Sequence, residues 1–466
     1  MNVIDLPIVG QSYHLDDWSI DCQKTLNFYP QAVESGNSPN VSALLPTPGL
    51  VQRFALSGAI RGLYALTNYV LCVAGTKLYK IDKNDIVSEI GTIGGGGLVH
   101  FADDSVRVMI VGSSAYEYNM KTGVLSQVPA EGFLGASDVA FLDSRFVWTV
   151  PNSGQIQWSN LISSATTALN YATAEAKSDN LVRTVVANGQ LWLIGEKTTE
   201  IWTSTGNKDL PYKRMSGAFI PTGCAAKNSV SLFGSSLIWL SRSEHGQSQI
   251  VMTEGYSAKR ISTHAIEAEI ARYVRIDDAY AFAYQQDGHA FYVLSFPTEK
   301  KTWCFDAVTN MWHERSYYNS TSYKHEHHRA IVHCFFNGEH LVGDREKGLV
   351  YRLCSDCSDD NGDTILRERI TPLINPHATR IVFDSVELSL QVGQDSNINP
   401  LIMFDWSDDE GRSWSNDRQV NIGAIGEFKK RVIFRRLGQS FGRVFRLRIS
   451  DPARLVILGA KARIRA

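Results

Sequence analysis

The segment RGLYALTNYVLCVAGTKLYKID, residues 61–82, decides the fold of this chain. Within it an apolar strand, a polar turn, a second hydrophobic strand, a glycine turn and an aromatic strand follow one another. Seven versions of this order are present, and the last three are looser than the first four. The later versions begin at Leu98, Asp138, Val182, Ser229, Ala279 and Ala330. The chain therefore contains an internal repeat of short strands.

The repeats begin roughly 37 to 51 residues apart, which is the length that a four-stranded propeller blade requires. One such sheet cannot bury both of its faces alone. Radial stacking gives each sheet two neighbours and leaves only short edges exposed. We therefore predict an all-β fold, a β-propeller of six or seven blades. A β-sandwich of sequential hairpins is the alternative, because strand counts alone do not exclude it.

The pattern divides the chain into three parts. Residues 1–60 lack the repeat and are interrupted by proline and glycine, so we predict an extended N-terminal arm leading into the ring. Residues 61–372 form the predicted propeller, with one amphipathic helix at Thr263–Val274. Residues 373–466 form a small C-terminal β-domain. Its strands are predicted near residues 380–392, 401–406, 430–437, 443–450 and 455–465.

Composition indicates a folded protein with a sizeable core, since 44% of the 466 residues are hydrophobic and 20% are charged. The formal net charge of −2 argues against a chain held on DNA by its overall charge. Acids stand near the N-terminus, where a secretory signal needs bases. No apolar run approaches the roughly 18 residues that span a bilayer. We expect synthesis in a cytoplasm and no membrane-spanning segment.

Seven scattered cysteines are not typical of a disulfide scaffold, so we expect most of them to be buried thiols. Cys354 and Cys357 have the C-x-x-C spacing of zinc and redox sites. No second C-x-x-C accompanies them, and no strand-to-helix context follows. We therefore predict no zinc or redox site at this pair.

Two other clusters have metal-ligand chemistry. The segment KHEHHR brings His325, His327 and His328 together, but adjacent histidines on a strand face opposite sides. The acidic run from Asp356 to Asp363 offers oxygen ligands for calcium, yet it lacks the glycine and the distal glutamate of an EF-hand. Both segments fall outside the repeats. We predict solvated loops there and no metal.

The stretch SDDEGRSW, residues 407–414, fits the S-x-D-x-G-x-x-W pattern of the Asp-box hairpin. We expect the Asp409 carboxylate to accept hydrogen bonds near Ser407, and Gly411 to adopt a positive φ. Trp414 is expected to pack beneath the turn. The pattern is also frequent in sialidases, but no arginine triad, tyrosine nucleophile and acid can be assigned around it. We predict a structural hairpin without catalytic residues.

Residues 429–465 hold twelve Lys or Arg residues against one acid. In Arg446-Leu447-Arg448 and in 461–465 the bases alternate with apolar residues, which places them on one sheet face. We predict that this basic C-terminal face is a protein interface. Pairing with acids of the same domain is the second possibility, and contact with DNA phosphates is the third. The candidate interface residues are Lys429, Lys430, Arg431, Arg435, Arg436, Arg443, Arg446, Arg448, Lys461, Arg463 and Arg465.

Several short motifs at the two ends of the chain occur together in one family. They are N-x-Y-P at 27–30, PTPGL at 46–50, RG at 61–62, AGTKLYK at 74–80 and KKRVIFRRLGQSFG from Lys429. In these motifs the chain resembles the packaged-DNA stabilisation proteins, or tail nozzle (tail hub) proteins, of short-tailed bacteriophages. The similarity covers most of the length and is dense at the two ends.

This resemblance implies a β-propeller protomer in a homo-hexameric tail ring beneath the portal and its adaptor. The ring would extend and close the portal channel, retain packaged double-stranded DNA and conduct it during ejection. A tail spike or fibre and a tail plug or needle would be its further partners. The implied location is the virion tail, after assembly in the host cytoplasm. Because DNA must slide through such a conduit, we expect a neutral or acidic lumen.

We predict no enzymatic activity and no cofactor, because the sequence contains no catalytic constellation and no nucleotide fingerprint. The alternative function is a propeller that binds or hydrolyses host glycans. It would require a pocket lined by Trp or Tyr, with two carboxylates about 5 to 10 Å apart. A cellular scaffold propeller that binds peptides is a third possibility.

Overall fold

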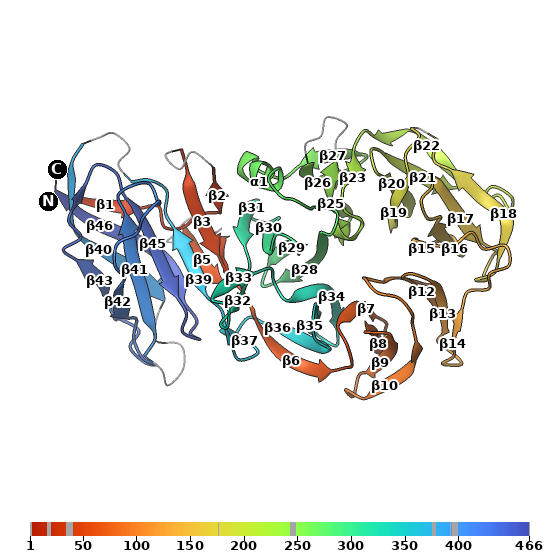
Figure 1. Cartoon of the computed structure of the whole chain (residues 1–466), viewed down its shortest axis with the longest axis horizontal. Helices are drawn as coiled ribbons and strands as arrows, with labels where there is room; N and C mark the ends of the chain where they lie inside the picture. The colour runs from red at the N-terminus through yellow and green to blue at the C-terminus, as the bar shows by residue number, and fades with distance from the viewer. Residues whose placement is uncertain are drawn as a thin grey trace.

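The chain forms a ring of β-sheets with a second β-domain at its side (Figure 1). The computed structural model describes residues 2–15, 20–33, 41–175, 177–242, 248–374, 379–391, 393 and 399–465. The middle of the chain makes the ring. Both ends of the chain lie close together in the second domain (Figure 1). The described residues contain no helix that is long and apolar enough to cross a bilayer.

The first four blades are antiparallel sheets whose four strands follow one another in sequence order. Blade 1 consists of β7 (Ile60–Ala65), β8 (Tyr69–Ala74), β9 (Lys77–Asp82) and β10 (Val87–Thr92). Blade 2 consists of β11 (His100–Asp103), β12 (Arg107–Val111), β13 (Ala115–Asn119) and β14 (Leu125–Gln127). Blade 3 consists of β15 (Asp138–Leu142), β16 (Arg145–Thr149), β17 (Gln155–Ser159) and β18 (Thr166–Thr173). Blade 4 consists of β19 (Leu181–Ala187), β20 (Gln190–Gly195), β21 (Thr199–Ser204) and β22 (Tyr212–Ile220).

The later blades take additional pieces of the chain. Blade 5 consists of β23 (Gly223–Cys224), β24 (Ser231–Phe233), β25 (Ser236–Arg242), β26 (Ser248–Glu254) and β27 (Ser257–Arg260), with the short helix η1 (Lys227–Ser229). Blade 6 consists of β28 (Tyr280–Gln286), β29 (His289–Phe296), β30 (Lys301–Asp306) and β31 (Met311–Glu314). Blade 7 consists of β34 (Ala330–Phe336), β35 (Glu339–Asp344), β36 (Leu349–Cys354) and β6 (Gly49–Ala55). A strand from outside the repeat thus closes the ring.

The predicted all-β propeller is confirmed, and the strands of the described residues give it seven blades, one for each repeat. The sandwich alternative is wrong for this part of the chain. The predicted helix is present as α1 (His264–Ile270), capped by Thr263, whose hydroxyl accepts a hydrogen bond from the Ile266 amide. Tight hairpins connect neighbouring strands within the blades. Asn188 and Gly189, for example, both have positive φ, as a type I′ turn requires.

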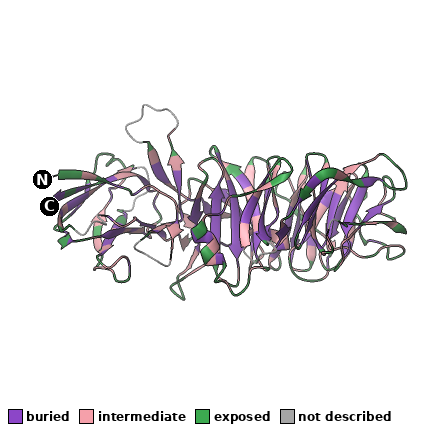
Figure 2. Cartoon of the chain, turned by 90° about the horizontal axis from the view of Figure 1, so that it is seen from above, coloured by how far each residue is buried: buried purple, intermediate pink, exposed green. Residues whose placement is uncertain are grey.

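The ring is held together by aromatic side chains between neighbouring blades. Trp148, Trp158, Trp192, Trp239 and Trp312 lie on strands of blades 3, 4, 5 and 6 and are all almost completely buried. Each such side chain removes a large apolar area from water, which makes it a main contributor to core stability. Figure 2 shows buried residues along the strands of the ring and exposed residues collected at its loops.

The second domain is a sandwich of two sheets. The first sheet contains β1 (Asn2–Leu6), β4 (Phe28–Ala32), β5 (Ser42–Pro46), β40 (Ile381–Gln391), β43 (Val432–Arg435), β44 (Gln439–Ser440) and β46 (Val456–Arg465). The second contains β2 (Tyr13–His14), β3 (Cys22–Leu26), β39 (Arg367–Ile370), β41 (Leu401–Ser407), β42 (Arg418–Asn421) and β45 (Val444–Ile449). Phe404 stacks between Phe434 and Phe445 in the core, at centroid distances of 4.4 and 5.3 Å. The predicted β-domain is confirmed. Residue 392, the predicted end of its first strand, lies outside the described residues.

The prediction of an extended arm for residues 1–60 is wrong for the described part of this segment. β1 pairs with β46, β4 and β5 form a hairpin beside β46, and β6 completes blade 7. Proline does not prevent this pairing, because Pro30 stands within β4 opposite Leu44. The second domain also begins before residue 373, since β39 already pairs with β45. The N-terminal segment therefore belongs to both domains.

One continuous sheet joins the ring to the sandwich. Its ten strands include all of blade 6, then β3, and then β39, β45, β41 and β42. Leu26 at the end of β3 pairs with Glu314 of blade 6 on one side and with Glu368 of the sandwich on the other. The two domains are thus connected through backbone hydrogen bonds as well as through the chain.

The N-terminal segment also packs into blade 6 with side chains. The Tyr29 ring meets the rings of His289 and Phe291 edge to face, at 4.9 and 5.2 Å. His289 is buried between Gln31, whose Oε1 lies 2.5 Å from Nε2, and Asp306, whose carboxylate lies 2.7 Å from Nδ1. The hydrogen bonds satisfy both ring nitrogens of a buried histidine.

Candidate assembly surface

The bases of the C-terminal domain lie on two surfaces. Leu447 of β45 and Ala462 of β46 both point into the shared core, so alternate residues point outward, as predicted. The two strands belong to different sheets of the sandwich, however. Arg446 and Arg463 therefore lie on opposite outer faces. The prediction of a single basic face is wrong, because sequence alternation does not show which sheet a strand joins.

Arg443 makes an internal ion pair. Its guanidinium donates hydrogen bonds to both oxygens of Asp408, at 2.6 and 2.8 Å, and to the carbonyl of Leu437, at 2.6 Å. Although it carries a charge, the Arg443 side chain is only 1% exposed. A bidentate carboxylate and a carbonyl satisfy a buried guanidinium well. This residue supports the sandwich fold and is not available to a partner.

Arg446 and Arg448 are paired in the same way. Arg446 donates to Asp405 from Nε at 2.9 Å, and from Nη2 to the second carboxylate oxygen. Arg448 donates to Asp405 at 3.2 Å and also to Asp417. The Arg446 guanidinium lies 4.0 Å from the ring centroid of Trp414. Pairing within the domain, the second possibility given by the sequence, describes these bases.

The outward side of the other sheet carries a separate group of bases. Arg431 pairs with both oxygens of Glu387, each at 2.7 Å, and this neighbour lowers the pKa of the glutamate. Arg465 donates to Asp384 at 2.9 and 2.5 Å. Nearby, Lys461 lies 3.9 Å from Asp5 of β1. These pairs are solvent-exposed and contribute little stability.

Arg435 and Arg463 complete this surface. Both are exposed, and both stand opposite Ser385 of β40, one on each neighbouring strand. Arg436 follows at the end of β43 with a φ of 57° and an exposed side chain. We call Arg431, Arg435, Lys461, Arg463 and Arg465 the outer basic face. Its five bases are interleaved with three acids, Asp5, Asp384 and Glu387, which leaves a surplus of two positive charges.

The last two predicted bases lie in the loop between β42 and β43. Lys430 binds Glu427 at 3.3 Å, while Lys429 is exposed. Two apolar side chains of the same loop are also exposed, Ile425 at 62% and Phe428 at 66%. A loop that combines bases with exposed apolar side chains is typical of a protein contact site.

The predicted Asp-box residues form a hairpin turn. Asp409 accepts hydrogen bonds from the Ser407 hydroxyl at 2.6 Å and from the backbone amide and hydroxyl of Ser413 at 2.8 and 2.5 Å. These donors hold the pKa of Asp409 well below its ordinary value. Gly411 has a φ of 96° and donates to the Ser407 hydroxyl at 2.6 Å. Trp414 packs against Arg446. The carboxylate is fully occupied by hydrogen bonds within the turn.

His327 and His328 are buried and His325 is half-buried, so the predicted solvated loop is wrong. His325 lies in the hairpin of β32 (Tyr317–Asn319) and β33 (Lys324–Glu326) and binds the Ser316 hydroxyl at 2.8 Å. Burial lowers the pKa of His327 and of His328 to about 3. No group of three metal-ligating side chains is present in the part of the chain that the structure describes.

The acidic run is also partly buried, contrary to the prediction of a solvated turn. It forms β37 (Asp359–Asp360) and β38 (Asp363–Thr364), and β37 pairs with β6. Burial raises the pKa of Asp360 to about 7. Asp363 binds Arg329 at 2.5 Å. The backbone of this run therefore helps to attach the closing strand of blade 7, through the pairing of Asp360 with Leu50.

Cys354 and Cys357 are joined by a disulfide, and both are half-buried. The expectation of buried thiols holds for the other five cysteines, which are free and buried. Cys354 and Cys357 are the exception, because a tight turn after β36 brings the two residues within bonding distance, with Cα atoms 5.3 Å apart.

A cavity of 850 Å³ lies beside α1. It contains the residue types that the glycan alternative requires, an aromatic side chain and two carboxylates, but they are not arranged for catalysis. Tyr273, Glu267 and Asp277 line it. Both carboxylates are already paired, Glu267 with Arg260 at 2.5 Å and Asp277 with Arg275 at 2.7 Å. The arginine pairing lowers the pKa of Asp277, so this group is not a proton donor near neutral pH. The arrangement does not favour hydrolysis.

The first strands of several blades line an open hollow of 230 Å³, with Phe101, Leu232, Phe282 and Val332 in its lining. Its volume has room for about eight water molecules at ~30 Å³ each. A DNA duplex cannot enter a space of this size.

Sequence reasoning missed a charged cluster that joins three blades. The buried carboxylate of Asp138 in blade 3 accepts hydrogen bonds from Arg183 Nη1 and the Thr184 amide of blade 4, both at 2.9 Å. His100 of blade 2 lies 3.9 Å from the same carboxylate. Each residue stands near the start of its repeat, so alignment of the repeats could have indicated a shared position.

Comparisons with known proteins identify the family. A family model described as bacteriophage P22 Gp10, beta-propeller, matches residues 6–358, and one described as bacteriophage P22 Gp10, beta-sandwich, matches residues 366–465. No curated protein matches the chain.

Three solved structures show distant similarity. The WD40 repeats of RRP9 align with a TM-score of 0.40 and 9% identity, over 66% of this chain and 99% of that one. PorZ of Porphyromonas gingivalis aligns with a TM-score of 0.38 and 11% identity, over 68% of this chain and 38% of that one. The computationally designed Ika8 protein gives 0.38 and 11%, over 66% and 99%.

The two family matches together cover the ring, the sandwich and most of the N-terminal segment that joins them. This chain therefore belongs to the bacteriophage P22 Gp10 family, a family of structural DNA-stabilisation proteins of the phage virion.

Proposed function

We propose that this chain is one protomer of the tail nozzle of a short-tailed phage. Six copies form a ring beneath the portal and its adaptor, where they extend and close the channel that retains packaged DNA. The same ring conducts the DNA during ejection. The observation that carries this proposal is the family match over both domains, residues 6–358 and 366–465.

The fold supports a role as a rigid building block. Blade 6 and the sandwich share one sheet, so the protomer can transmit load between its neighbours without a flexible joint. The hollow lined by the first strands of the propeller is small, with a volume of 230 Å³. In the proposed ring, DNA therefore passes between the copies and not through each propeller.

The charge arrangement favours protein partners over DNA at the outer basic face. Its bases alternate with acids, and three of the five are already in ion pairs. Binding to phosphates requires bases that are free to replace counterions. We assign this face and the 425–430 loop to contacts with the portal-adaptor, the tail spike or fibre, or the tail plug or needle.

Imaging of the purified chain mixed with portal-adaptor complexes tests the proposal. We expect a sixfold ring attached to the adaptor. Phage particles assembled without this protein should lose their DNA, which a nuclease-protection assay measures. A chain that stays monomeric beside the adaptor, together with particles that retain DNA in its absence, would overturn the proposal.

The glycan alternative makes a different prediction in solution. Purified protein that cleaves or binds host polysaccharide as a monomer would favour it. The ion pairs of Glu267 and Asp277 argue for the opposite result. We expect no release of reducing sugar and no retention on immobilised polysaccharide.

A further inference from the structure

The strand that closes the ring is held by one tight crossing of the chain. β6 pairs along one edge with β36, and the register ends with Gly49 opposite Cys354. The chain then turns, with the Cys357 amide bonded to the Cys354 carbonyl at 3.4 Å, and crosses to the other edge of β6. There Asp360 of β37 pairs with Leu50. A short segment thus encloses the start of β6 from both sides.

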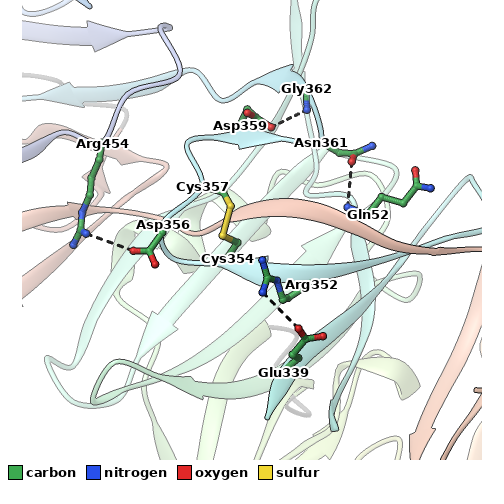
Figure 3. The surroundings of a disulfide bond; sticks show 10 residues. All are labelled: Gln52, Glu339, Arg352, Cys354, Asp356, Cys357, Asp359, Asn361, Gly362 and Arg454. Atoms are coloured by element: carbon green, nitrogen blue, oxygen red, sulfur yellow. Dashed lines mark hydrogen bonds and ion pairs between the residues drawn. A yellow bond between two sulfur atoms is a disulfide. The ribbon is translucent and has the colours of Figure 1, made fainter. Parts of the chain in front are cut away.

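Contacts on the far edge fix this crossing in place (Figure 3). The Asn361 amide donates to the Leu50 carbonyl at 2.7 Å, and the Asn361 side chain accepts from the Gln52 amide at 3.1 Å. Gly49 lies directly beneath the crossing, since a Cβ built there would stand 2.3 Å from the Asp359 carbonyl oxygen. β6 cannot leave blade 7 unless this segment moves.

The disulfide spans the crossing (Figure 3). It joins Cys354 at the end of β36 to Cys357, the residue from which the chain continues to β37. Between them, Asp356 reaches Arg454 of the sandwich at 3.7 Å. The bond therefore closes the short loop that carries the chain over the end of the closing strand.

This cysteine pair is accessible to redox reagents, whereas the remaining cysteines are protected. Both of its members are half-buried, and the other five cysteines are buried. Burial raises the pKa of Cys22 and Cys224 to about 11 and of Cys304 and Cys334 to about 12. It also raises the pKa of Cys72. Since the thiolate is the reactive form, these five react slowly near neutral pH.

We propose that Cys354 and Cys357 are a redox-operated lock on ring closure. The pair is a dithiol while the protein folds and assembles in a reducing cytoplasm, and it becomes a disulfide after the particle reaches an oxidising exterior. This timing rests on the proposed virion function. The lock itself rests on the position of the pair over β6.

The reaction is ordinary thiol–disulfide exchange. The thiolate of one cysteine attacks a low-molecular-weight disulfide such as oxidised glutathione, forms a mixed disulfide and releases one glutathione thiolate. The second cysteine, as its thiolate, then displaces the other glutathione. Two protein thiols are oxidised, one small disulfide is reduced to two thiols, and two protons pass to solvent or to the released thiolates.

Hydrogen exchange of the purified full chain in glutathione buffers tests the lock. Alkylation followed by mass measurement of the unfolded chain should count seven thiols in the reduced protein and five in the oxidised protein. Oxidation should slow amide exchange in β6 by about tenfold, because it closes a short loop. Exchange in β20 of blade 4 should not change. The double variant Cys354→Ser/Cys357→Ser should exchange at the reduced rate in both buffers.

Three results would overturn the lock. The first is a pair that stays reduced in excess oxidised glutathione. The second is oxidation that leaves exchange in β6 unchanged. The third is a double-serine variant that still responds to the redox buffer. All three are measured on isolated protein, so they do not depend on whether the chain forms a nozzle.

Discussion

The Nε atom of Arg369 donates a hydrogen bond to the carbonyl oxygen of Ile8 at 2.6 Å, although the two residues stand 361 positions apart. The same guanidinium reaches the Gln11 carbonyl at 3.2 Å, the Thr25 hydroxyl at 2.9 Å and the Gln23 side chain at 2.7 Å. These acceptors are neutral, and burial lowers the pKa of Arg369 to about 9. One side chain thus fastens the N-terminal segment to the sandwich.

Replacing Arg369 by Met should lower the free energy of unfolding by about 3 kcal/mol, because several buried acceptors lose their donor. Urea denaturation followed by tryptophan fluorescence measures the change. Arg463→Met is the matched control, since Arg463 is exposed, and its effect should stay within about 0.5 kcal/mol. Equal losses in the two variants would contradict the role of Arg369.

Asp138 should be essential to the junction of blades 2, 3 and 4. Asp138→Asn removes the negative charge that compensates Arg183 in a buried site, and we expect a loss of about 2–4 kcal/mol. Thermal unfolding monitored by circular dichroism measures it. Asp277→Asn breaks an exposed pair with Arg275 and should cause no measurable change. An Asp138→Asn protein as stable as the control would show that the cluster is dispensable.

Gly49 should tolerate no side chain. Gly49→Ala places a methyl group against the Asp359 carbonyl, which forces the crossing away from β6, and we expect a loss of about 1–3 kcal/mol. Gly96→Ala is the control, because nothing lies within 4 Å of a Cβ built there. Limited proteolysis near residue 49 should be faster in Gly49→Ala alone. Identical digestion of the two variants would argue against a tight crossing.

Acid should destabilise the protein through His328. Its pKa falls from the ordinary 6.5 to about 3 in the folded state, because burial disfavours the cation. Below pH 6.5 the unfolded chain binds a proton that the folded chain does not. Stability is therefore complete above pH 6.5 and declines as the pH falls toward 3, by about 4 kcal/mol for this group.

The variant His328→Asn isolates this effect. Its side-chain oxygen can accept the Ala330 amide hydrogen bond that His328 Nδ1 accepts at 3.2 Å. Urea denaturation at a series of pH values should show a flatter dependence between pH 6.5 and 3. A variant whose stability falls as steeply as that of the parent protein would rule out His328 as a source of acid sensitivity.

The outer basic face should act in assembly and not in folding. The double variant Arg435→Glu/Arg463→Glu reverses two exposed charges, and binding to portal-adaptor complexes should weaken roughly tenfold, with the largest difference at low salt. Unfolding should be unchanged. The double variant Lys121→Glu/Lys208→Glu is the control, because it makes the same change of charge at exposed positions of the ring. Its binding should be unchanged. If both double variants bind alike, the interface lies elsewhere.

Local patterns in the sequence predicted local structure well. The alternation in Arg446-Leu447-Arg448 correctly placed Leu447 in the core, and the seven repeats correspond to seven blades. Alternation could not show that β45 and β46 lie in different sheets. Neither could it show that Asp405 and Asp408 neutralise Arg446 and Arg443, because ion pairing depends on which strands become neighbours.

The N-terminal segment could not be predicted for a related reason. Its strands are short and contain residues such as Pro30, and they exist because distant partners provide hydrogen bonds. In the sequence β6 has no neighbouring strand to pair with, because its partner β36 belongs to blade 7, far along the chain. The disulfide was missed similarly, since C-x-x-C spacing does not show whether the backbone turns back on itself at Cys354.

The strand β3 has a mechanical consequence. Because it is hydrogen-bonded to blade 6 at Leu26–Glu314 on one edge and to the sandwich on the other, a tilt between the two halves would have to break backbone hydrogen bonds. The bond from the Asn27 amide to the Glu314 carbonyl, at 2.9 Å, also resists such a tilt, whereas a linker bends freely. The propeller and the sandwich should therefore move as one rigid body. A channel built from such rigid protomers would open by movement at the interfaces between copies, while each chain keeps its shape.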